Sequence, residues 1–342
     1  AERQCALFNS ENYRSALRLD STCHHLYGNM IDEIRSDIEN LLGAEPDLDR
    51  VVVGAKHGPG VAQGADYRKG RSTSYYKWAT LPYSVTPAAI SLAKRAISED
   101  PRWIGALDDW YRERSNNRFR PIDVEDFWSR VLLPVEHSRI TTVPKTALTD
   151  RTIAIEPLMN VFLQLGVDSI IRQRLKKRWH IDINSQELNQ TLARQGAVDG
   201  SYATIDLSAA SDTISLKLCE MLLPVAWYDL LLTLRCPKGD LDGVVGSFDK
   251  ISSMGNGFTF ALETLIFGAL TRFAMKRLRN HDQIAVFGDD IVVPTPVAGA
   301  VIKLLNIFGF SINIEKSFID GPFRESCGSD WFLADDVRPV FL

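Results

Sequence analysis

The sequence predicts an α+β fold built around an antiparallel sheet. Segments with the alternating pattern of strands and segments with helical spacing are mixed without the regular order of βαβ units. The stretch "IAVFGDDIVVPT" (284–295) has apolar runs on both sides of Gly288 and Asp289, which is typical of a β-hairpin with a tight turn. At 342 residues, 45% of them hydrophobic and 24% charged, the chain is long enough for one large core or a few subdomains.

The N-terminal part is predicted to be mainly helical and rich in loops. Residues 30–43 carry isoleucines and leucines at helical spacing and end in a glycine, as an amphipathic helix does. Further along, "SRITTVPK" (138–145) and the end of "TALTDRTIAIEP" (146–157) indicate two short strands. A helix is expected from Met159 toward Arg178.

The C-terminal part is expected to alternate strands with longer helices. A strand at 202–207 precedes a corner of small residues and an amphipathic helix that Pro224 closes. A glycine-rich loop at 254–257 runs into a long apolar helix. After the Gly-Asp-Asp hairpin, a helix at 298–310 and a strand at 311–314 complete the pattern.

Composition excludes several classes of protein. The five cysteines show no C-x-x-C spacing, which argues against a disulfide framework or a zinc site. No stretch approaches the ~18 uninterrupted apolar residues of a membrane span, so no membrane association is expected. The net charge of −4 argues against a surface coated with phosphate-binding cations, although a local groove is compatible with it.

Basic residues nevertheless cluster in four places. The segment "YRKGRSTSYYKW" (67–78) interleaves cations with aromatic rings, a pattern suited to nucleic acid because bases stack on rings while cations follow phosphates. We treat it as a candidate nucleic-acid contact. The segments at 112–120, 172–178 and 272–279 are more typical of solvated helix faces.

Three aspartates are candidates for a metal site. Asp206 ends one predicted strand, and Asp289 and Asp290 lie at the hairpin turn, so neighbouring strands would bring their carboxylates to one end of the sheet. Close carboxylates repel one another unless a cation lies between them. Mg²⁺ accepts carboxylate and phosphate oxygens, and a pair of such ions serves phosphoryl transfer. The alternatives are a solvated turn for the hairpin pair and a helix N-cap for Asp206, although Asp212 is better placed to be that cap.

Further motifs resemble a known family. The chain carries, in order, segments similar to the palm motifs of positive-strand RNA polymerases. Their amino-acid sequences resemble those of the replicase subunit of the leviviruses, the small RNA bacteriophages. These segments are "DLSAASD" (206–212), "SSMGNGFT" (252–259), "FGDD" (287–290), "FGFSINIEKSF" (308–318) and "FRESCG" (323–328). Upstream, "VPKTALTDRTIAIEP" (143–157) resembles the fingers motif that holds the incoming triphosphate. The resemblance implies a right-hand polymerase with fingers and an N-terminal region at 1–200 and a palm at 201–342.

The resemblance also implies roles for individual residues. Asp206 and Asp289 would hold two Mg²⁺ ions, for which Mn²⁺ is a possible substitute, with Asp290 as a weaker or indirect ligand. Lys145 and Arg151 would bind the triphosphate, since arginine can form a forked pair with phosphate and lysine acts as a point charge.

The assignment of the sugar-reading residue stays open. Five residues separate Asp206 from Asp212, where many positive-strand polymerases have four, so Asp212, Asn256 and Glu263 are alternatives for contacting the ribose 2′-hydroxyl. Lys316 would be the general acid for pyrophosphate departure, with an ordinary exposed lysine as the alternative. The remaining nucleotide contacts implied by the resemblance are Ser252, Gly255 and Thr259. Gly255 and Gly257 are expected to let the backbone approach the template or nucleotide closely.

The implied function is template-directed RNA synthesis from NTPs, replicating a positive-strand phage genome in the cytoplasm of the infected bacterial host. The partners would be template and product RNA, NTPs, and host translation elongation factors Tu and Ts with a ribosomal protein. A reverse transcriptase-like polymerase and an inactive RNA-binding fragment are the alternatives. Gly288 and the small corner at 208–211 favour ribonucleotides. The family's polymerases continue into a thumb after the segment at 323–328, so the thumb is expected to be largely absent.

Overall fold

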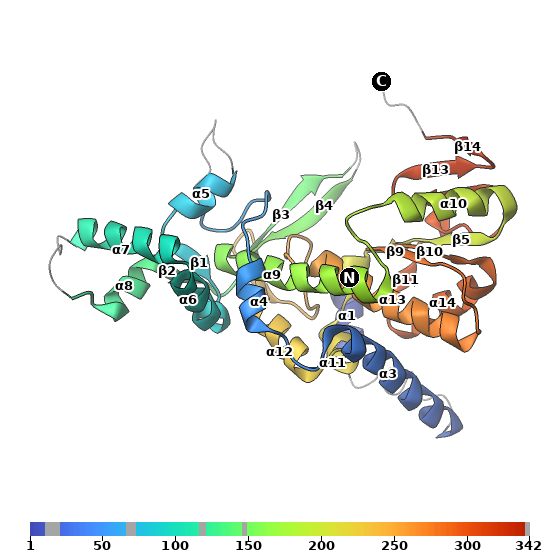
Figure 1. The fold of residues 1–342 in the computed structure, drawn as a ribbon, viewed down its shortest axis with the longest axis horizontal. Helices are drawn as coiled ribbons and strands as arrows, with labels where there is room; N and C mark the ends of the chain where they lie inside the picture. Colours follow the sequence, from blue (N-terminus) through green and yellow to red (C-terminus); the bar gives the residue numbers. More distant parts are fainter. Residues whose placement is uncertain (11–20, 66–72, 116–120, 146–148, 339–342) are drawn as a thin grey trace.

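The computed structural model describes residues 1–10, 21–65, 73–115, 121–145 and 149–338, and the molecule that it shows is elongated (Figure 1). The α-helices are Glu2–Asn9 (α1), Ser21–Leu42 (α3), Leu48–Gly54 (α4), Thr73–Ala79 (α5), Ile90–Glu99 (α6), Pro101–Ser115 (α7), Val124–Val131 (α8), Leu158–Arg174 (α9), Glu187–Asp199 (α10), Leu216–Leu222 (α11), Val225–Leu234 (α12), Thr259–Arg277 (α13) and Thr295–Ile307 (α14). The strands are Tyr83–Val85 (β1), Leu132–Pro134 (β2), Ser138–Pro144 (β3), Asp150–Ile155 (β4), Tyr202–Ile205 (β5), Leu207–Ser208 (β6), Lys238–Leu241 (β7), Val244–Ser247 (β8), Ala285–Phe287 (β9), Asp290–Pro294 (β10), Ser311–Ile312 (β11), Phe323–Ser326 (β12), Ser329–Phe332 (β13) and Asp335–Asp336 (β14).

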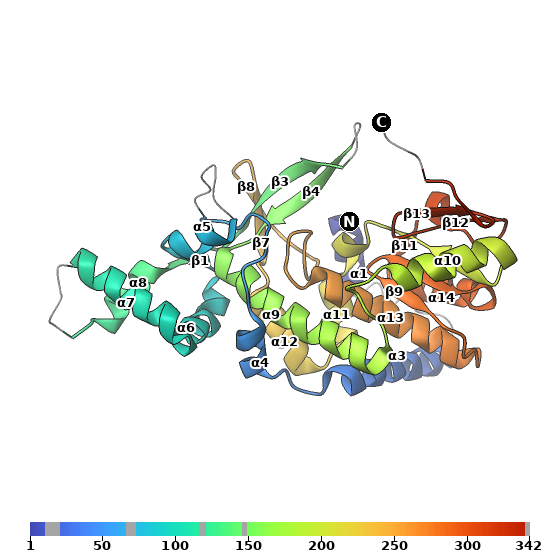
Figure 2. The ribbon, with the colours of Figure 1, turned by 45° about the horizontal axis from the view of Figure 1, so that its top comes forward.

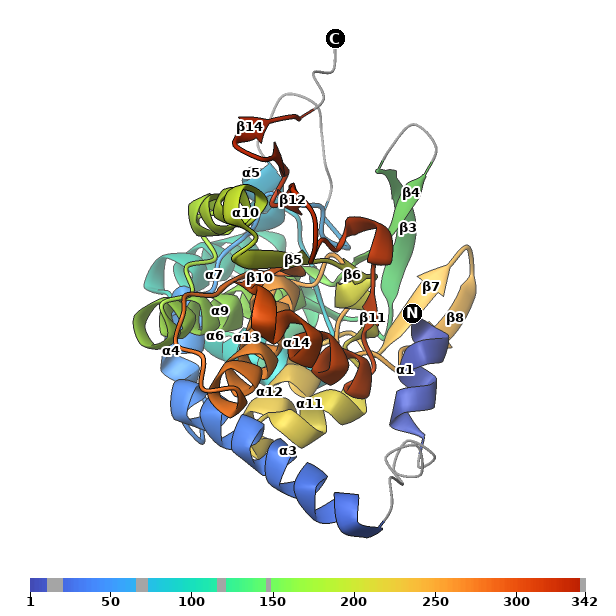
Figure 3. The ribbon, with the colours of Figure 1, turned by 90° about the vertical axis from the view of Figure 1, so that its right-hand side faces the viewer.

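An antiparallel sheet in the order β5-β10-β9 forms the centre of the C-terminal part, as the sequence predicts. Helix α10 packs on one face of this sheet, and α13 and α14 pack on the other (Figure 3). Because both faces are covered, every residue of β5 and nearly all of β10 are buried, which explains the continuous apolar runs in their sequence.

Two long helices connect this sheet to the rest of the molecule. Helix α13 is buried on almost all of its sides, because it packs against α3, α9 and α14. Helix α9 is buried along most of its length against α4, α13 and β1. A helix that is apolar on all sides belongs in the interior of a large domain, so these two helices form a central part of the hydrophobic core. Within the described residues, no helix is both long and apolar enough to cross a bilayer.

A second sheet, in the order β4-β3-β7-β8, joins distant parts of the chain. Strand β3 pairs in parallel with β7, with Ser138 opposite Gly239, so β3 and β4 share a sheet with β7 and β8 (Figure 2). The sequence analysis did not predict the β7–β8 hairpin. Its signal was the Asp-Gly dipeptide at 242–243, which is typical of a tight hairpin turn, and both residues have positive φ in the structure.

Two helix boundaries differ from the sequence prediction. Helix α9 ends at Arg174 and continues as a π-helical turn, Leu175–Trp179, which is followed by His180 in a left-handed conformation. Helix α11 begins at Leu216, and Ser215 caps it by accepting a hydrogen bond from the Leu218 amide. Asp212 as the helix N-cap is therefore wrong, because the chain first makes a short 3₁₀ turn at Ala210–Thr213.

Candidate active site

Asp206 follows β5 directly and is held by the segment that contains β11. Its backbone amide donates to the Ser317 hydroxyl (3.0 Å), and its carbonyl accepts from the Asn313 amide (2.9 Å). The Asn313 side chain donates to the Asp206 carboxylate at 2.8 Å. The residue that follows β11 thus fixes the Asp206 carboxylate. The sequence analysis missed Asn313, because only the pairing of β6 with β11 brings it beside Asp206.

Asp289 and Asp290 lie at the turn between β9 and β10. Phe287 pairs with Asp290, so Gly288 and Asp289 are the two central residues, and Gly288 has a φ of 61°. A Cβ atom at Gly288 would lie 2.5 Å from the Phe260 ring, so only glycine fits this position. The Gly288 amide donates to the Thr264 hydroxyl of α13 at 2.9 Å, which anchors the turn.

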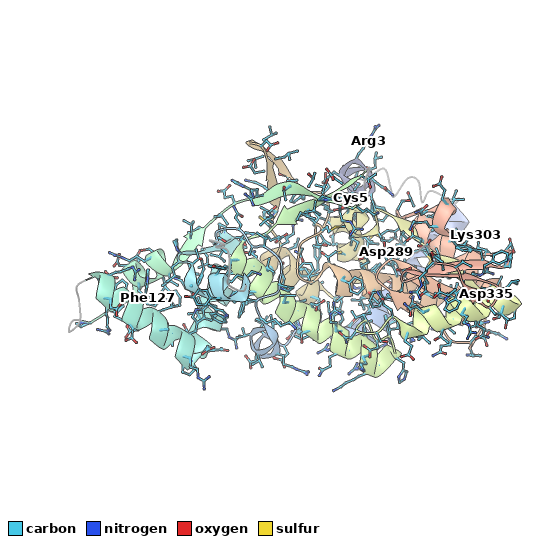
Figure 4. All side chains as sticks on the ribbon, turned by 90° about the horizontal axis from the view of Figure 1, so that it is seen from above. Arg3, Cys5, Phe127, Asp289, Lys303 and Asp335 are labelled. Carbon is cyan, nitrogen blue, oxygen red and sulfur yellow. The ribbon has the colours of Figure 1, made fainter. Side chains whose placement is uncertain are left out.

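The register of the sheet brings the acids together. Ile291 pairs with Ile205, so Asp290 and Asp206 leave the same end of adjacent strands. The three aspartates therefore lie at the same end of this sheet. Seen from above, Asp289 lies toward the centre of the molecule rather than at either end (Figure 4).

Burial and mutual repulsion disfavour the ionised forms of these acids. Burial raises the pKa of Asp206 to about 6, with further increases from Asp289 and Asp290, while the hydrogen bond from Asn313 opposes the rise. Burial, and then the charge of Asp290, raise the pKa of Asp289. Burial also raises the pKa of Asp290, against the hydrogen bonds from residues 326 and 327. The site therefore holds electrostatic repulsion that a bound cation would relieve.

The donor set fits a hard divalent cation. Carboxylate oxygens at one strand edge are the ligands that Mg²⁺ prefers, and Mg²⁺ usually takes only one or two of them and completes its shell with water and substrate phosphates. In the described part of the chain, no group of three or more His, Cys, Asp or Glu side chains forms a ready-made cation site. The residues thus fit an ion whose remaining ligands come from substrate and solvent.

Cations of the β3–β4 hairpin reach this site electrostatically. Lys145 and Arg151 are exposed near the tip of the hairpin, and residues 146–148 between them lie outside the described residues. The charges of Arg151 and Lys145 oppose the rise in the pKa of Asp289. The two residues predicted to bind the triphosphate thus interact electrostatically with one of the predicted metal ligands.

Lys316 also belongs to this cluster. Its side chain is half exposed and forms an ion pair with Glu325 of β12 at 3.3 Å. Burial lowers the pKa of Lys316, but the nearby negative charges of Glu325, Asp206 and Asp290 outweigh that effect and raise it. The lysine is thus kept protonated beside the aspartates, as a proton donor would need to be.

A family model described as "RNA replicase, beta-chain" matches residues 1–342. The chain belongs to this family. The RNA-directed RNA polymerase subunit beta of Escherichia virus Qbeta is 38% identical over all of this chain and 53% of the relative. The corresponding subunit of Enterobacteria phage SP is 51% identical over 60% of this chain and 36% of the relative, and the beta chain of Enterobacteria phage fr is 39% identical over 90% and 53%.

The chain spans about half the length of the curated relatives that it matches most fully. Among solved structures, the RNA-dependent RNA polymerase of a human picorbirnavirus is similar over 57% of this chain and 42% of its own, with 17% identity and a TM-score of 0.41. That likeness is too weak to support a structural argument.

In this replicase family member, Asp212 is bound by a lysine that the sequence analysis missed. The Lys250 ammonium lies 2.7 Å from the Asp212 carboxylate and 3.3 Å from that of Glu2 in α1. The Lys250 side chain is only 10% exposed, so this pair is partly shielded from water. A 2′-hydroxyl would meet an aspartate that is already paired, which leaves the sugar-reading role of Asp212 open.

Glu263 is a fourth carboxyl group beside the aspartates. It lies on α13, is 5% exposed, and its pKa is raised well above the ordinary value by burial and by the charges of Asp289, Asp212 and Asp290. Both effects favour the neutral carboxyl group, which can donate a hydrogen bond as well as accept one.

The loop at 252–258 packs into the protein more tightly than the sequence suggests. Ser252, Asn256 and Thr259 are all buried. The Asn256 side chain accepts from the Phe258 amide at 3.0 Å and faces the buried carboxyl group of Glu156. Its amide is therefore already engaged within the protein.

Gly255 is required for a different reason from the expected one. Its φ is 109°, and a Cβ atom there would lie 2.2 Å from the carbonyl oxygen of Ala154 in β4. The Gly257 amide donates to the side-chain oxygen of Gln164 at 2.8 Å, and a Cβ atom at Gly257 would lie 2.9 Å from the Gln164 side chain in α9. Both glycines therefore allow this loop to pack closely against β4 and α9, and their approach to template or nucleotide stays a prediction.

The basic and aromatic segment at 67–78 is only partly visible, because residues 66–72 lie outside the described residues, as do 116–120 of another basic cluster. Tyr75 and Trp78 are exposed, as a base-stacking surface would require. Lys77 is 1% exposed and donates to the Gly58 carbonyl, so it is not available to a phosphate. The expected interleaving of cations and rings is thus wrong at Lys77.

The raised pKa of Asp206 predicts how stability depends on pH. The folded value of about 6 lies above the ordinary 3.8, so the contribution of Asp206 to stability is present below pH 4 and lost as pH rises through 6. In metal-free buffer at pH 7, Asp206→Asn should raise the free energy of unfolding by an amount on the order of 1 kcal/mol, since solvent screens part of the repulsion. Chemical denaturation at several pH values measures this effect, and the exposed Asp335→Asn serves as control. An equal response of the two variants would contradict the prediction.

Proposed function

We propose that the chain carries the fingers (1–200) and palm (201–342) of an RNA-directed RNA polymerase that copies an RNA template from NTPs. The observation that carries this proposal is that Asp206, Asp289 and Asp290 lie at one end of an antiparallel sheet, where the charges of Lys145 and Arg151 act on Asp289. Family membership supports the same assignment.

The proposed reaction joins a primer 3′-oxygen to the α-phosphorus of an NTP and breaks the bond to the β-phosphate, which releases pyrophosphate. Asp206 and Asp289 would hold Mg²⁺, or Mn²⁺ in its place, with Asp290 as an indirect or weaker ligand. When bound, such ions stabilise charge on the attacking and leaving oxygens. Lys145 and Arg151 would bind the triphosphate, and Lys316 would supply the proton that pyrophosphate takes up.

Template and product RNA and NTPs are the proposed partners, in the cytoplasm of an infected bacterium. The host elongation factors Tu and Ts and a ribosomal protein are further proposed partners, supported by the resemblance to levivirus replicases. Glu263, Asp212 and Asn256 are the candidates for sugar recognition, and we favour Glu263, because Lys250 engages Asp212 and the side-chain amide of Asn256 is engaged within the loop.

Extension of a labelled RNA primer on an RNA template tests the proposal. The full-length replicase subunit, with NTPs and dNTPs in separate reactions, should extend the primer with NTPs and much less with dNTPs. Equal extension with both would support a reverse transcriptase-like enzyme instead. RNA binding without extension in either reaction would support the inactive RNA-binding alternative.

Arg151→Ala should weaken use of NTPs far more than binding of RNA, because its proposed partner is the triphosphate. Loss of a charge-assisted hydrogen bond is worth about 1.5–3 kcal/mol, so KM for NTPs should rise about ten-fold or more while the Kd for RNA changes less than about two-fold. Steady-state kinetics and fluorescence anisotropy measure the two quantities. Arg139→Ala, an exposed arginine at the other end of β3, is the matched control. Equal loss of both properties would place Arg151 in the template channel.

A further inference from the structure

The turn between β12 and β13 has an unusual conformation for its sequence. Ser326 pairs with Ser329, and the two central residues, Cys327 and Gly328, have φ values of 50° and 68°. Positive φ at both positions is the pattern of a type I′ turn, which favours Asn or Asp followed by Gly. A cysteine there costs roughly 1 kcal/mol or more, and such strain is concentrated at functional sites.

This turn directs hydrogen-bond donors at Asp290. The Cys327 amide donates to Oδ1 of Asp290 at 3.0 Å, and the Ser326 hydroxyl approaches the same oxygen at 3.3 Å. From α10, the side-chain amide of Asn189 donates to the Asp290 carbonyl at 3.1 Å and lies 3.4 Å from the Ser326 hydroxyl. Ser326 and Asn189 are 1% and 3% exposed, so solvent does not compete for these contacts.

The arrangement leaves the two oxygens of Asp290 in different states. Oδ1 accepts both bonds from the turn, whereas no hydrogen bond to Oδ2 occurs among the described residues. A carboxylate fixed in this way cannot rotate freely and presents one oxygen in a defined direction. Asp206 is held in a comparable manner, because Asn313 donates to one of its oxygens at 2.8 Å.

We propose that Ser326 and Asn189 are positioning residues that fix the Asp290 carboxylate so that its free oxygen supports a divalent cation at the strand edge. The inference rests on the proposed function, since it assumes that a cation binds beside Asp206, Asp289 and Asp290. Groups that orient a ligand, without touching the metal themselves, typically change metal affinity or activity by about 10- to 100-fold when removed.

Mn²⁺ binding to the purified chain tests the inference without depending on polymerase activity. Free Mn²⁺ is measured by electron paramagnetic resonance during titration of the wild type, Asp206→Asn, Ser326→Ala and Ser329→Ala. Ser329 is the matched control, because it lies opposite Ser326 in the same hairpin and is 2% exposed. Ser326→Ala should weaken Mn²⁺ binding about ten-fold, while Ser329→Ala leaves it unchanged and both retain similar melting temperatures.

Two further variants separate positioning from general packing. Cys327→Gly keeps the amide donor and suits the positive φ but removes the thiol that also interacts with Asp290, so it should raise the melting temperature and weaken Mn²⁺ binding less than Ser326→Ala does. Ser326→Cys keeps the volume but offers only a weak donor, and it repeats the test if the alanine variant is unstable.

The outcomes distinguish this inference from the proposed function. Equal Mn²⁺ affinity for Ser326→Ala, Ser329→Ala and the wild type would overturn the positioning role and leave the cation site intact. Equal Mn²⁺ binding by the wild type and Asp206→Asn would remove the cation site at this strand edge, and the positioning role with it.

Discussion

Asp289→Asn is expected to abolish nucleotide addition while leaving the protein folded. The carboxylate lies at the β9–β10 turn, where its negative charge raises the pKa of Asp206. Asparagine keeps its size but removes the charge that would hold a cation, so transition-state stabilisation through that cation is lost. We expect the rate of primer extension to fall by about 1,000-fold or more, which corresponds to about 4 kcal/mol.

The fold should be retained, because the substitution removes repulsion rather than a stabilising contact. Burial and the charge of Asp290 already raise the pKa of Asp289. A neutral amide at this position removes the electrostatic repulsion that Asp289 exerts on Asp206 and Glu263. The melting temperature of metal-free Asp289→Asn should equal or exceed that of the wild type. Asp335→Asn, at an exposed position, should change neither property. Extension by Asp289→Asn within ten-fold of the wild type would contradict the assignment.

Arg324→Ala is expected to be the most destabilising substitution that we consider. The Arg324 side chain is fully buried in β12, where burial lowers its pKa. It donates hydrogen bonds to a set of backbone carbonyls that join β12 to the start of β5, the strand that leads to Asp206. These carbonyls belong to Tyr202 (2.6 Å), Ile319 (2.8 Å), Asp320 (3.3 Å), Gly321 (2.8 Å) and Phe323 (2.7 Å).

Alanine would leave several buried carbonyls without a donor and a cavity in place of the guanidinium. Each unsatisfied buried group costs about 1–3 kcal/mol, so the total loss should reach about 4 kcal/mol or more. That is a large part of the about 5–15 kcal/mol that stabilises a typical domain. Chemical denaturation measures the loss, and Arg277→Ala, which removes a half-exposed ion pair with Glu33, should cost less than about 1 kcal/mol. Similar stabilities of the two variants would contradict the structural role of Arg324.

Several features of the fold could be predicted from local sequence. The Gly-Asp-Asp hairpin, the strand before Asp206 and the long helix after the glycine-rich loop all occur where the residue pattern places them. Each depends on interactions between residues close in the chain, such as the positive φ of Gly288, or on a continuous apolar pattern. The three aspartates could be selected from their places at predicted strand ends, and the hairpin cations from the resemblance of the segment at 143–157 to the family's fingers motif.

The tertiary structure decided which groups surround these residues. The parallel pairing of β3 with β7 unites segments about 100 residues apart, and no local pattern specifies which strand a given edge will accept. The close contact of Gly255 with Ala154 could not be predicted for the same reason, because β4 and the loop meet only in the folded chain.

The partners of the acids were also decided at this level. Lys250 binds Asp212 from 38 residues away, and Ser326 reaches Asp290 from 36 residues away. By itself, the sequence determined which side chains are the candidates for the chemistry, because residue type and short-range backbone geometry are encoded locally. Only the tertiary structure decided their protonation and orientation, because burial and hydrogen bonding depend on the packing of segments that are distant in the chain.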